Sequence, residues 1–431
     1  MSSADQVSAG TQGNSQGFFG SITATWRKAN ERPMADYYLI LGVTTAFVML
    51  GLFMVLSASS VIAMAQQHNP FYYGRLQLVY TVVGIPIVFV CSRFSLKVYK
   101  WVAGVAMVLA ILLLIIVILP IPHGPGVTLG GQTAWLQVTP TQRVQPSEFA
   151  KAALVVWSAS LFAEPWRSKR LDETRILLLP YSLVAGLVLV LVALEKDYGT
   201  LAIIGVIALM QLWFAGANGR VMGVLLGLAG FAGAIVVVIK WANVELFLAT
   251  RFPFLHLPVP PGASDQPDNA LYALATGRWW GVGIGASRQK WGGLYSGAHT
   301  DYILAVLGEE LGLFCMLLVF AMLFTLIFTG LRIARRSDQT FWRLAAAGMT
   351  SWLMVQAGVN TLVAFGMLPV LGVPFPFLSY GGSSLWSCLI AVGVLLAAAR
   401  HEPDAQAALA ARSKRRKTPQ VAGVVVAGRK K

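Results

Sequence analysis

Long runs of apolar residues follow one another along most of the chain. A helix that crosses a bilayer needs roughly 18 or more predominantly apolar residues, and several runs reach that length. Taken as helices, the runs predict about ten membrane spans and an all-α polytopic membrane protein. The predicted spans are 37–60, 75–95, 98–120, 147–164, 175–193, 198–216, 219–242, 302–334, 341–366 and 377–400.

The polar connections between the runs differ in charge. If the basic N-terminal residues are cytoplasmic, alternate connections are internal, and those connections, such as 93–100 and 332–343, are the basic ones. Both chain termini are therefore expected in the cytoplasm. The connections left outside are 120–146, 195–197, 365–376 and a long external loop, 243–301, between spans seven and eight.

Three regions follow from this pattern. Residues 1–35 form a Gly/Ser/Gln-rich cytoplasmic arm without the apolar core of a secretory signal, so the first span is expected to remain as an anchor. Residues 36–400 form the membrane domain. Residues 401–431 form a basic cytoplasmic tail that is expected to be disordered or bound to the membrane surface. The N-terminal arm, 1–35, is also expected to be disordered.

Composition narrows the class of partner. The 431 residues are 56% hydrophobic and 12% charged, with a formal net charge of +15. The cations lie between the spans and in the tail, which favours anionic lipid over nucleic acid. Cys91, Cys315 and Cys388 fall within or beside apolar runs, as buried small side chains do, and they indicate neither disulfides nor a metal cluster.

Asp301 ends the long loop at the mouth of a membrane helix, where a charge is costly. It is either the N-cap of that helix or a general base at the head group of a membrane-anchored substrate, and a helix N-terminus stabilises the anion in both cases. Run 302–334 corresponds to about 50 Å of helix against a hydrocarbon core of about 30 Å. Its first turns, with Glu309 and Glu310, are therefore expected above the hydrocarbon or against a wet cavity, with Asp301 at the cavity rim.

The fourth span opens with Pro146 and Glu148, which suit the first turn of a helix. Lys151 lies three residues after Glu148 and on the same face. This arrangement is either an ordinary helix start or a buried pair that orients a sugar or meets a phosphate. Asp197 is expected to cap the sixth span, in a turn with Glu195 that is interpreted as solvated or as part of the site.

Cations of the long loop are expected at the membrane interface, unless several converge near Asp301 to bind a diphosphate. They are Arg251, Arg278, Arg288 and Lys290.

The small residues of 379–384, near the outer end of the last span, permit close helix packing or form a patch that touches substrate. Gln356 and Asn360 share one face of the ninth span and are expected to form hydrogen bonds inside the bundle.

Four motifs occur in a fixed order: 145–151 (Gln-Pro-Ser-Glu-Phe-Ala-Lys), 197–200 (Asp-Tyr-Gly-Thr), 298–301 (Ala-His-Thr-Asp) with 308–312, and 376–384. Together they resemble the SEDS family, which contains FtsW and RodA, in order and spacing over about residues 36–400. Segments 32–34 and 399–403 look more like the FtsW branch than the RodA branch.

This resemblance implies the SEDS fold and a peptidoglycan glycosyltransferase that polymerises lipid II on the outer face of the bacterial plasma membrane, at the division septum. Asp301 would be the base that removes the proton from the 4-hydroxyl of a lipid II GlcNAc. That oxygen would attack C1 of the MurNAc of a second lipid-linked chain, with inversion, and expel undecaprenyl diphosphate. The residues implied to contact substrate are Glu148, Lys151, Asp197, Lys290, Arg251, Arg288, His299, Thr300 and Ser379.

The resemblance also implies a class B penicillin-binding protein as partner, expected against the spans of 302–366, together with other divisome proteins. The sequence indicates no definite cofactor, and a divalent cation such as Mg²⁺ or Mn²⁺, which suits a departing diphosphate, is left open. The alternatives are a lipid II flippase, which needs a polar path through both leaflets, a RodA-type elongation polymerase, and a division scaffold. One departure from the family is that 131–135 lacks the arginine usual before Trp135.

Overall fold

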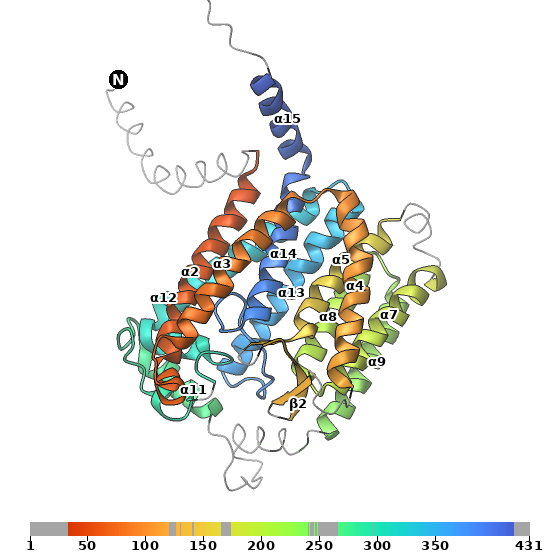
Figure 1. Ribbon diagram of the computed structural model, residues 1–431. Helices are drawn as coiled ribbons and strands as arrows, with labels where there is room; N and C mark the ends of the chain where they lie inside the picture. The colour runs from red at the N-terminus through yellow and green to blue at the C-terminus, as the bar shows by residue number, and fades with distance from the viewer. Residues whose placement is uncertain are drawn as a thin grey trace, which may run out of the picture.

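The computed structural model describes residues 33–119, 126–129, 131–139, 142–164, 174–239, 241, 245, 248, 266–295 and 297–417. Within these residues the apolar runs form a helical bundle (Figure 1), and each predicted span coincides with a helix. The spans are α2 (Ala35–Gln67), α3 (Tyr72–Arg93), α4 (Leu96–Ile118), α5 (Pro146–Phe162), α7 (Thr174–Leu194), α8 (Tyr198–Phe214), α9 (Gly219–Ile239), α12 (Ile303–Arg336), α13 (Thr340–Ala364) and α14 (Gly382–Arg400).

Six helices in the described part of the chain are long and apolar enough to cross a membrane: α2, α3, α4, α9, α12 and α14. The others pack into the same bundle, although α5 and α8 have only 17 residues each. Helix α14 packs against α2, α3, α5 and α13 and is almost wholly buried, so it lies at the centre. Large apolar side chains are exposed on α2, α3, α4 and α9, as expected of a surface that faces lipid.

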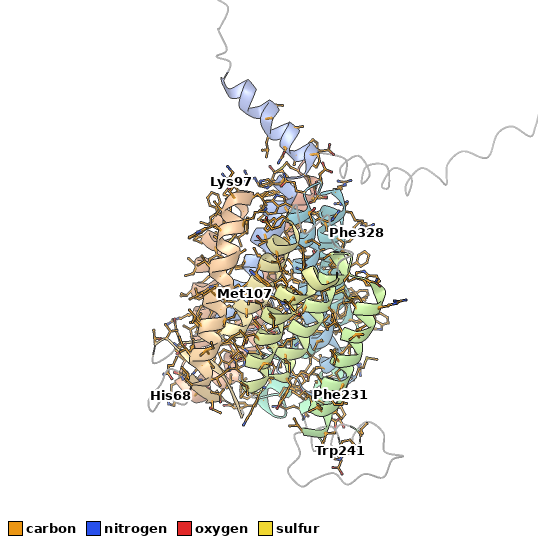
Figure 2. All side chains as sticks on the ribbon, turned by 90° about the vertical axis from the view of Figure 1, so that its right-hand side faces the viewer. His68, Lys97, Met107, Phe231, Trp241 and Phe328 are labelled. Atoms are coloured by element: carbon orange, nitrogen blue, oxygen red, sulfur yellow. The ribbon has the colours of Figure 1, made fainter. Side chains whose placement is uncertain are left out.

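The two ends of the bundle differ. Figure 2 shows Lys97 near one end and His68 and Trp241 near the other, with Met107 between them. The end near Lys97 carries α15 (Pro403–Lys417), so the first part of the basic tail is helical. The opposite end carries α11 (Gln266–Gly277) and a small antiparallel sheet, β1 (Gly126–Leu129), β2 (Gln132–Gln137) and β3 (Arg143–Val144), in the order β1-β2-β3.

Helix α12 is interrupted at Gly312, whose φ of 76° and ψ of −175° are not helical. A side chain there would collide with the backbone of Trp279, Trp280 and Gly281, so only glycine fits. The loop after α11 enters the interruption and pairs with it through backbone hydrogen bonds. The Leu313 and Phe314 amides donate to the Arg278 and Trp279 carbonyls at 2.9 and 3.3 Å, respectively.

Run 302–334 is too long for a single span, as expected, and the interruption divides it at Gly312. The turns before Gly312 form a separate segment covered by the loop after α11, so the expectation that Glu309 and Glu310 face a wet cavity is wrong, while their place above the hydrocarbon stays a prediction. Glu309 and Glu310 are both buried there, because the loop provides their hydrogen-bond and ionic partners. The part that follows the break, from Leu313 to Arg336, is close to the length that a bilayer requires.

Candidate active site

A cavity of about 730 Å³ opens at the sheet-bearing end of the bundle. Its walls come from the ends of α2 and α3, the sheet, the turn before α12 and the start of α14. Aromatic side chains and one guanidinium provide most of its chemistry. They include Tyr72, Tyr73, Tyr80, Trp135, Arg143, His299 and Tyr380.

Asp301 follows two residues of this wall, His299 and Thr300, in the turn before α12. The N-cap of α12 is Tyr302, and no side chain caps this helix, so the capping interpretation of Asp301 is wrong. The carboxyl is partly buried, and this burial, together with the negative charge of Asp197, raises the pKa of Asp301 to about 6. Such a group is ionised at neutral pH but is a stronger base than an exposed carboxylate.

His299 packs between two tyrosine rings, with centroid distances of 5.1 Å to Tyr73 and 5.5 Å to Tyr380. Burial lowers the pKa of His299 to about 4, so the imidazole is neutral at physiological pH. Its Nδ1 has no hydrogen-bond partner among the described residues. The uncharged ring lines the cavity, while its Nδ1 is itself buried.

The carbonyls of three consecutive residues in this turn each accept a hydrogen bond. His299 accepts from the Tyr380 amide at 2.9 Å, Thr300 from Ser379 Oγ at 2.6 Å, and Asp301 from Asn360 Nδ2 at 2.8 Å. Ser379 is 4% exposed, and the described hydrogen bonds of its hydroxyl are to the backbone. The structure thus places Ser379 behind the wall of the cavity.

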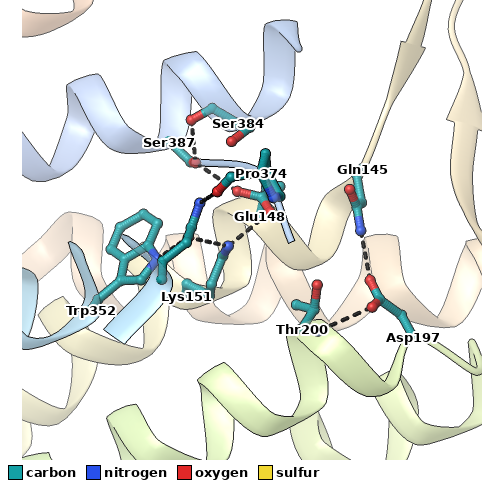
Figure 3. Close-up of polar contacts among 10 residues, drawn as sticks. Gln145, Glu148, Lys151, Asp197, Thr200, Trp352, Pro374, Ser384 and Ser387 are labelled. Atoms are coloured by element: carbon teal, nitrogen blue, oxygen red, sulfur yellow. Dashed lines mark hydrogen bonds and ion pairs between the residues drawn. The ribbon is translucent and has the colours of Figure 1, made fainter. Parts of the chain in front are cut away.

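Asp197 caps α8 as predicted, because its Oδ1 accepts from the Thr200 amide at 3.0 Å (Figure 3). Its Oδ2 accepts from Gln145 Nε2 at 2.7 Å. Burial raises the pKa of Asp197, although the bonds from Thr200 oppose that shift. Glu195 is fully buried in the same turn, so the interpretation of this turn as solvated is wrong.

Glu148 and Lys151 form an ion pair of 2.8 Å, as their spacing predicts, with both side chains 1% exposed. Figure 3 shows this pair directed toward Trp352 and Ser387, inside the bundle. Lys151 also donates to Gln356 Oε1 at 2.9 Å, and Ser387 Oγ donates to Glu148 Oε2 at 3.0 Å. Neither charge lines the cavity described above.

The loop cations do not converge on Asp301 in the described part of the chain. Lys290 is buried and forms an ion pair of 2.9 Å with Glu310, which also accepts from Ser57 Oγ. Arg288 has an exposed side chain, and its amide donates to Glu309. Arg251 lies outside the described residues.

Sequence reasoning missed Arg143, the one formally charged side chain among the described residues that line the cavity. It lies on β3, paired with Gln137 of β2, close to Trp135 of the same hairpin. The sequence feature that could have identified Arg143 is its position just before the 145–151 motif. The β2–β3 hairpin thus places Arg143 at the cavity, whereas 131–135 lacks the arginine that is usual before Trp135 in the family that the sequence resembles.

The described residues contain no group of three or more His, Cys, Asp or Glu side chains that could hold a metal ion. Within this part of the chain, a divalent cation at a departing diphosphate would therefore find no ready-made cluster of three protein ligands.

Comparisons with known proteins agree with this architecture. The family model described as "Cell cycle protein", for FtsW, RodA and SpoVE, matches residues 37–404. The chain is 34% identical over 382 residues to the probable peptidoglycan glycosyltransferase FtsW of Mycobacterium tuberculosis, covering 88% of this chain and 71% of that protein. It is 36% identical over 358 residues to the protein of the same description from Coxiella burnetii, covering 82% of this chain and 93% of that protein.

Solved structures share the fold. RodA of Thermus thermophilus, a rod shape determining protein, aligns with a TM-score of 0.58 at 22% identity over 84% of this chain and 96% of that chain. A chain from a peptidoglycan synthase complex, in a study of how polymerization and crosslinking are coordinated, aligns with a TM-score of 0.61 at 22% identity over the same shares.

Proposed function

Because the chain belongs to the FtsW, RodA and SpoVE family, we propose that it is a peptidoglycan glycosyltransferase that polymerises lipid II on the outer face of the membrane during cell division. The observation that carries this proposal is the large aromatic cavity whose wall at His299 and Thr300 continues directly into Asp301. A carboxylate of raised basicity beside a cavity of this size suits a base that acts on a sugar hydroxyl.

Asp301 takes the proton from the 4-hydroxyl of the GlcNAc of one lipid II. The freed electron pair of that oxygen forms a bond to C1 of the MurNAc of a second lipid-linked chain. The bond from C1 to the diphosphate oxygen breaks, the centre inverts, and undecaprenyl diphosphate leaves with the bonding electrons. The proton on Asp301 passes to water before the next addition.

The cavity residues have separate parts in this scheme. Arg143 is the cation placed to stabilise the negative charge of the leaving diphosphate, because a guanidinium matches phosphate oxygens geometrically. The tyrosines and the neutral His299 offer ring faces and uncharged polar atoms, which suit a sugar. Asp197, through its negative charge, keeps Asp301 basic.

The protein's setting is part of the same proposal. The apolar helices and the family make it a multi-pass membrane protein. The basic inner connections support cytoplasmic termini, and the family supports a place at the division septum. A class B penicillin-binding protein is the proposed partner, supported by the fold shared with a chain of a peptidoglycan synthase complex.

The test is polymerisation of lipid II by purified protein, with and without the partner. Asp301→Asn is expected to abolish glycan synthesis while the variant keeps the wild-type membrane level and unfolds at no lower denaturant concentration than the wild type, since it removes a buried charge. Asp338→Asn, an exposed carboxylate between α12 and α13, is the matched control and should retain activity. Normal polymerisation by Asp301→Asn refutes the assignment, and lipid II translocation in vesicles without polymerisation by the wild type would identify a flippase.

A further inference from the structure

The turn that carries Asp301 is held by its backbone, at the three carbonyls of His299, Thr300 and Asp301. We propose that Ser379 and Asn360 are positioning residues that fix the Asp301 carboxylate at the cavity, and that Lys151 anchors them through Gln356. This inference rests on the proposed function, because it assigns these residues a part in that reaction.

The Ser379 hydroxyl both accepts and donates a hydrogen bond. Oγ accepts from the Phe375 amide at 2.8 Å and donates to the Thr300 carbonyl at 2.6 Å. Because the hydroxyl is both donor and acceptor to backbone groups, its rotation is fixed. Ser379 therefore joins the bend before α14 to the residue that precedes Asp301.

Asn360, on α13, also joins the turn that carries Asp301 to the segment before α14. Its Nδ2 donates to the carbonyls of Asp301 and Val373, at 2.8 Å in both cases. A side-chain amide has two N–H groups, so both are engaged. Since Asn360 is 1% exposed, losing this amide would leave two buried carbonyls without their donor.

Both residues are tied to one segment, 373–379, since Ser379 belongs to it and Asn360 donates to its Val373 carbonyl, and this segment is itself anchored. Gln356 Nε2 donates to the Pro374 carbonyl at 3.0 Å, and Gln356 Oε1 accepts from Lys151 Nζ at 2.9 Å. Figure 3 shows Pro374 beside the Glu148–Lys151 pair. The buried ion pair thus connects to the catalytic turn through a chain of hydrogen bonds, although it does not line the cavity.

Misplacing a catalytic group by about 1 Å can cost roughly 100-fold in rate without weakening substrate binding. For Ser379→Ala and Asn360→Ala we therefore expect kcat for lipid II polymerisation to fall about 10- to 100-fold, with KM within about 2-fold of wild type. Ser379→Thr keeps the hydroxyl and should recover most of the rate. Thr361→Ala is the matched control on α13, because among the described residues Thr361 Oγ1 bonds within its own helix, to the Ala357 carbonyl.

Hydrogen exchange provides a second readout that does not depend on activity. The amides of 297–305 should exchange faster in Ser379→Ala and Asn360→Ala than in Thr361→Ala, and Gln356→Leu should also accelerate exchange in 373–379. A rise in KM with unchanged kcat in Ser379→Ala would make Ser379 a substrate contact and overturn the proposal. The proposal would also be overturned if the amides of 297–305 exchanged no faster in Ser379→Ala and Asn360→Ala than in Thr361→Ala. If the wild type does not polymerise lipid II but the exchange pattern holds, the proposed function fails. The conclusion that Ser379 and Asn360 hold the turn of 299–301 in place then still stands.

Discussion

Glu195→Gln is predicted to stabilise the folded protein at neutral pH. Glu195 is fully buried in the turn between α7 and α8, and neither carboxyl oxygen has a hydrogen-bond partner among the described residues. Burial and the negative charge of Asp197 raise the pKa of Glu195 from 4.5 to about 9. The carboxyl is therefore neutral in the folded state at pH 7 but ionised in the unfolded state.

The size of the effect follows from this difference. Folding at pH 7 requires protonation of a group whose unfolded pKa is 4.5, which costs about 3 kcal/mol. Gln has the same shape and no charge, so the substitution removes this cost. Since the pKa is raised, the penalty grows between pH 4.5 and pH 9, and at pH 5 the expected gain is below about 1 kcal/mol.

The measurement is unfolding of detergent-solubilised protein by denaturant, followed by tryptophan fluorescence at pH 5 and pH 7. Glu164→Gln is the matched control, because that side chain is 42% exposed and its contact with Lys100 is 3.5 Å long. The control should change the free energy of unfolding by less than about 1 kcal/mol at both pH values. A stabilisation by Glu195→Gln that is equal at the two pH values, or absent at pH 7, would refute the reasoning.

Three further predictions concern the base, the interrupted helix and the buried pair. The polymerisation rate should fall as the pH drops through about 6, because Asp301 must be ionised to accept a proton; a rate–pH profile that is flat between pH 5 and pH 7 would contradict this. Gly312→Ala should destabilise the protein by about 2 kcal/mol or more in denaturant unfolding, since its φ is 76° and backbone fills the space, whereas Gly227→Ala, in open space on α9, should not. Lys151→Met should cost about 3–5 kcal/mol by leaving Glu148 buried and unpaired. Adding Glu148→Gln should recover part of that loss, and no recovery would show that the charge is not the cause.

The spans were predictable because each depends on a local run of apolar residues. The interruption of α12 was not, because it depends on partners far away in sequence. Lys290 forms an ion pair with Glu310, and Ser57 Oγ donates a hydrogen bond to the same carboxylate. The backbone of 278–283 fills the space beside Gly312. A run such as 302–334 contains no sign of these contacts.

The site divides in the same way. The Glu148–Lys151 pair and the Asp197 cap follow from spacing along a helix, and both were predicted. Arg143 was missed because a short hairpin within 126–144 depends on pairing between strands, which the Gly- and Thr-rich sequence specifies weakly. Whether Asp301 caps α12 could not be decided from its position before the helix, because only the backbone geometry shows Tyr302 as the N-cap.

The interruption at Gly312 also limits how this chain can be recombined with others. The segment of α12 that starts at Leu313 has its first two amides bonded to the carbonyls of Arg278 and Trp279, in the loop after α11. In a chimera that exchanged this loop alone, a replacement whose backbone followed another path past Gly312 would leave those amides without acceptors, and orphan donors are costly near lipid. The loop after α11 and the part of α12 around Gly312 should therefore be transferable between relatives only as one unit.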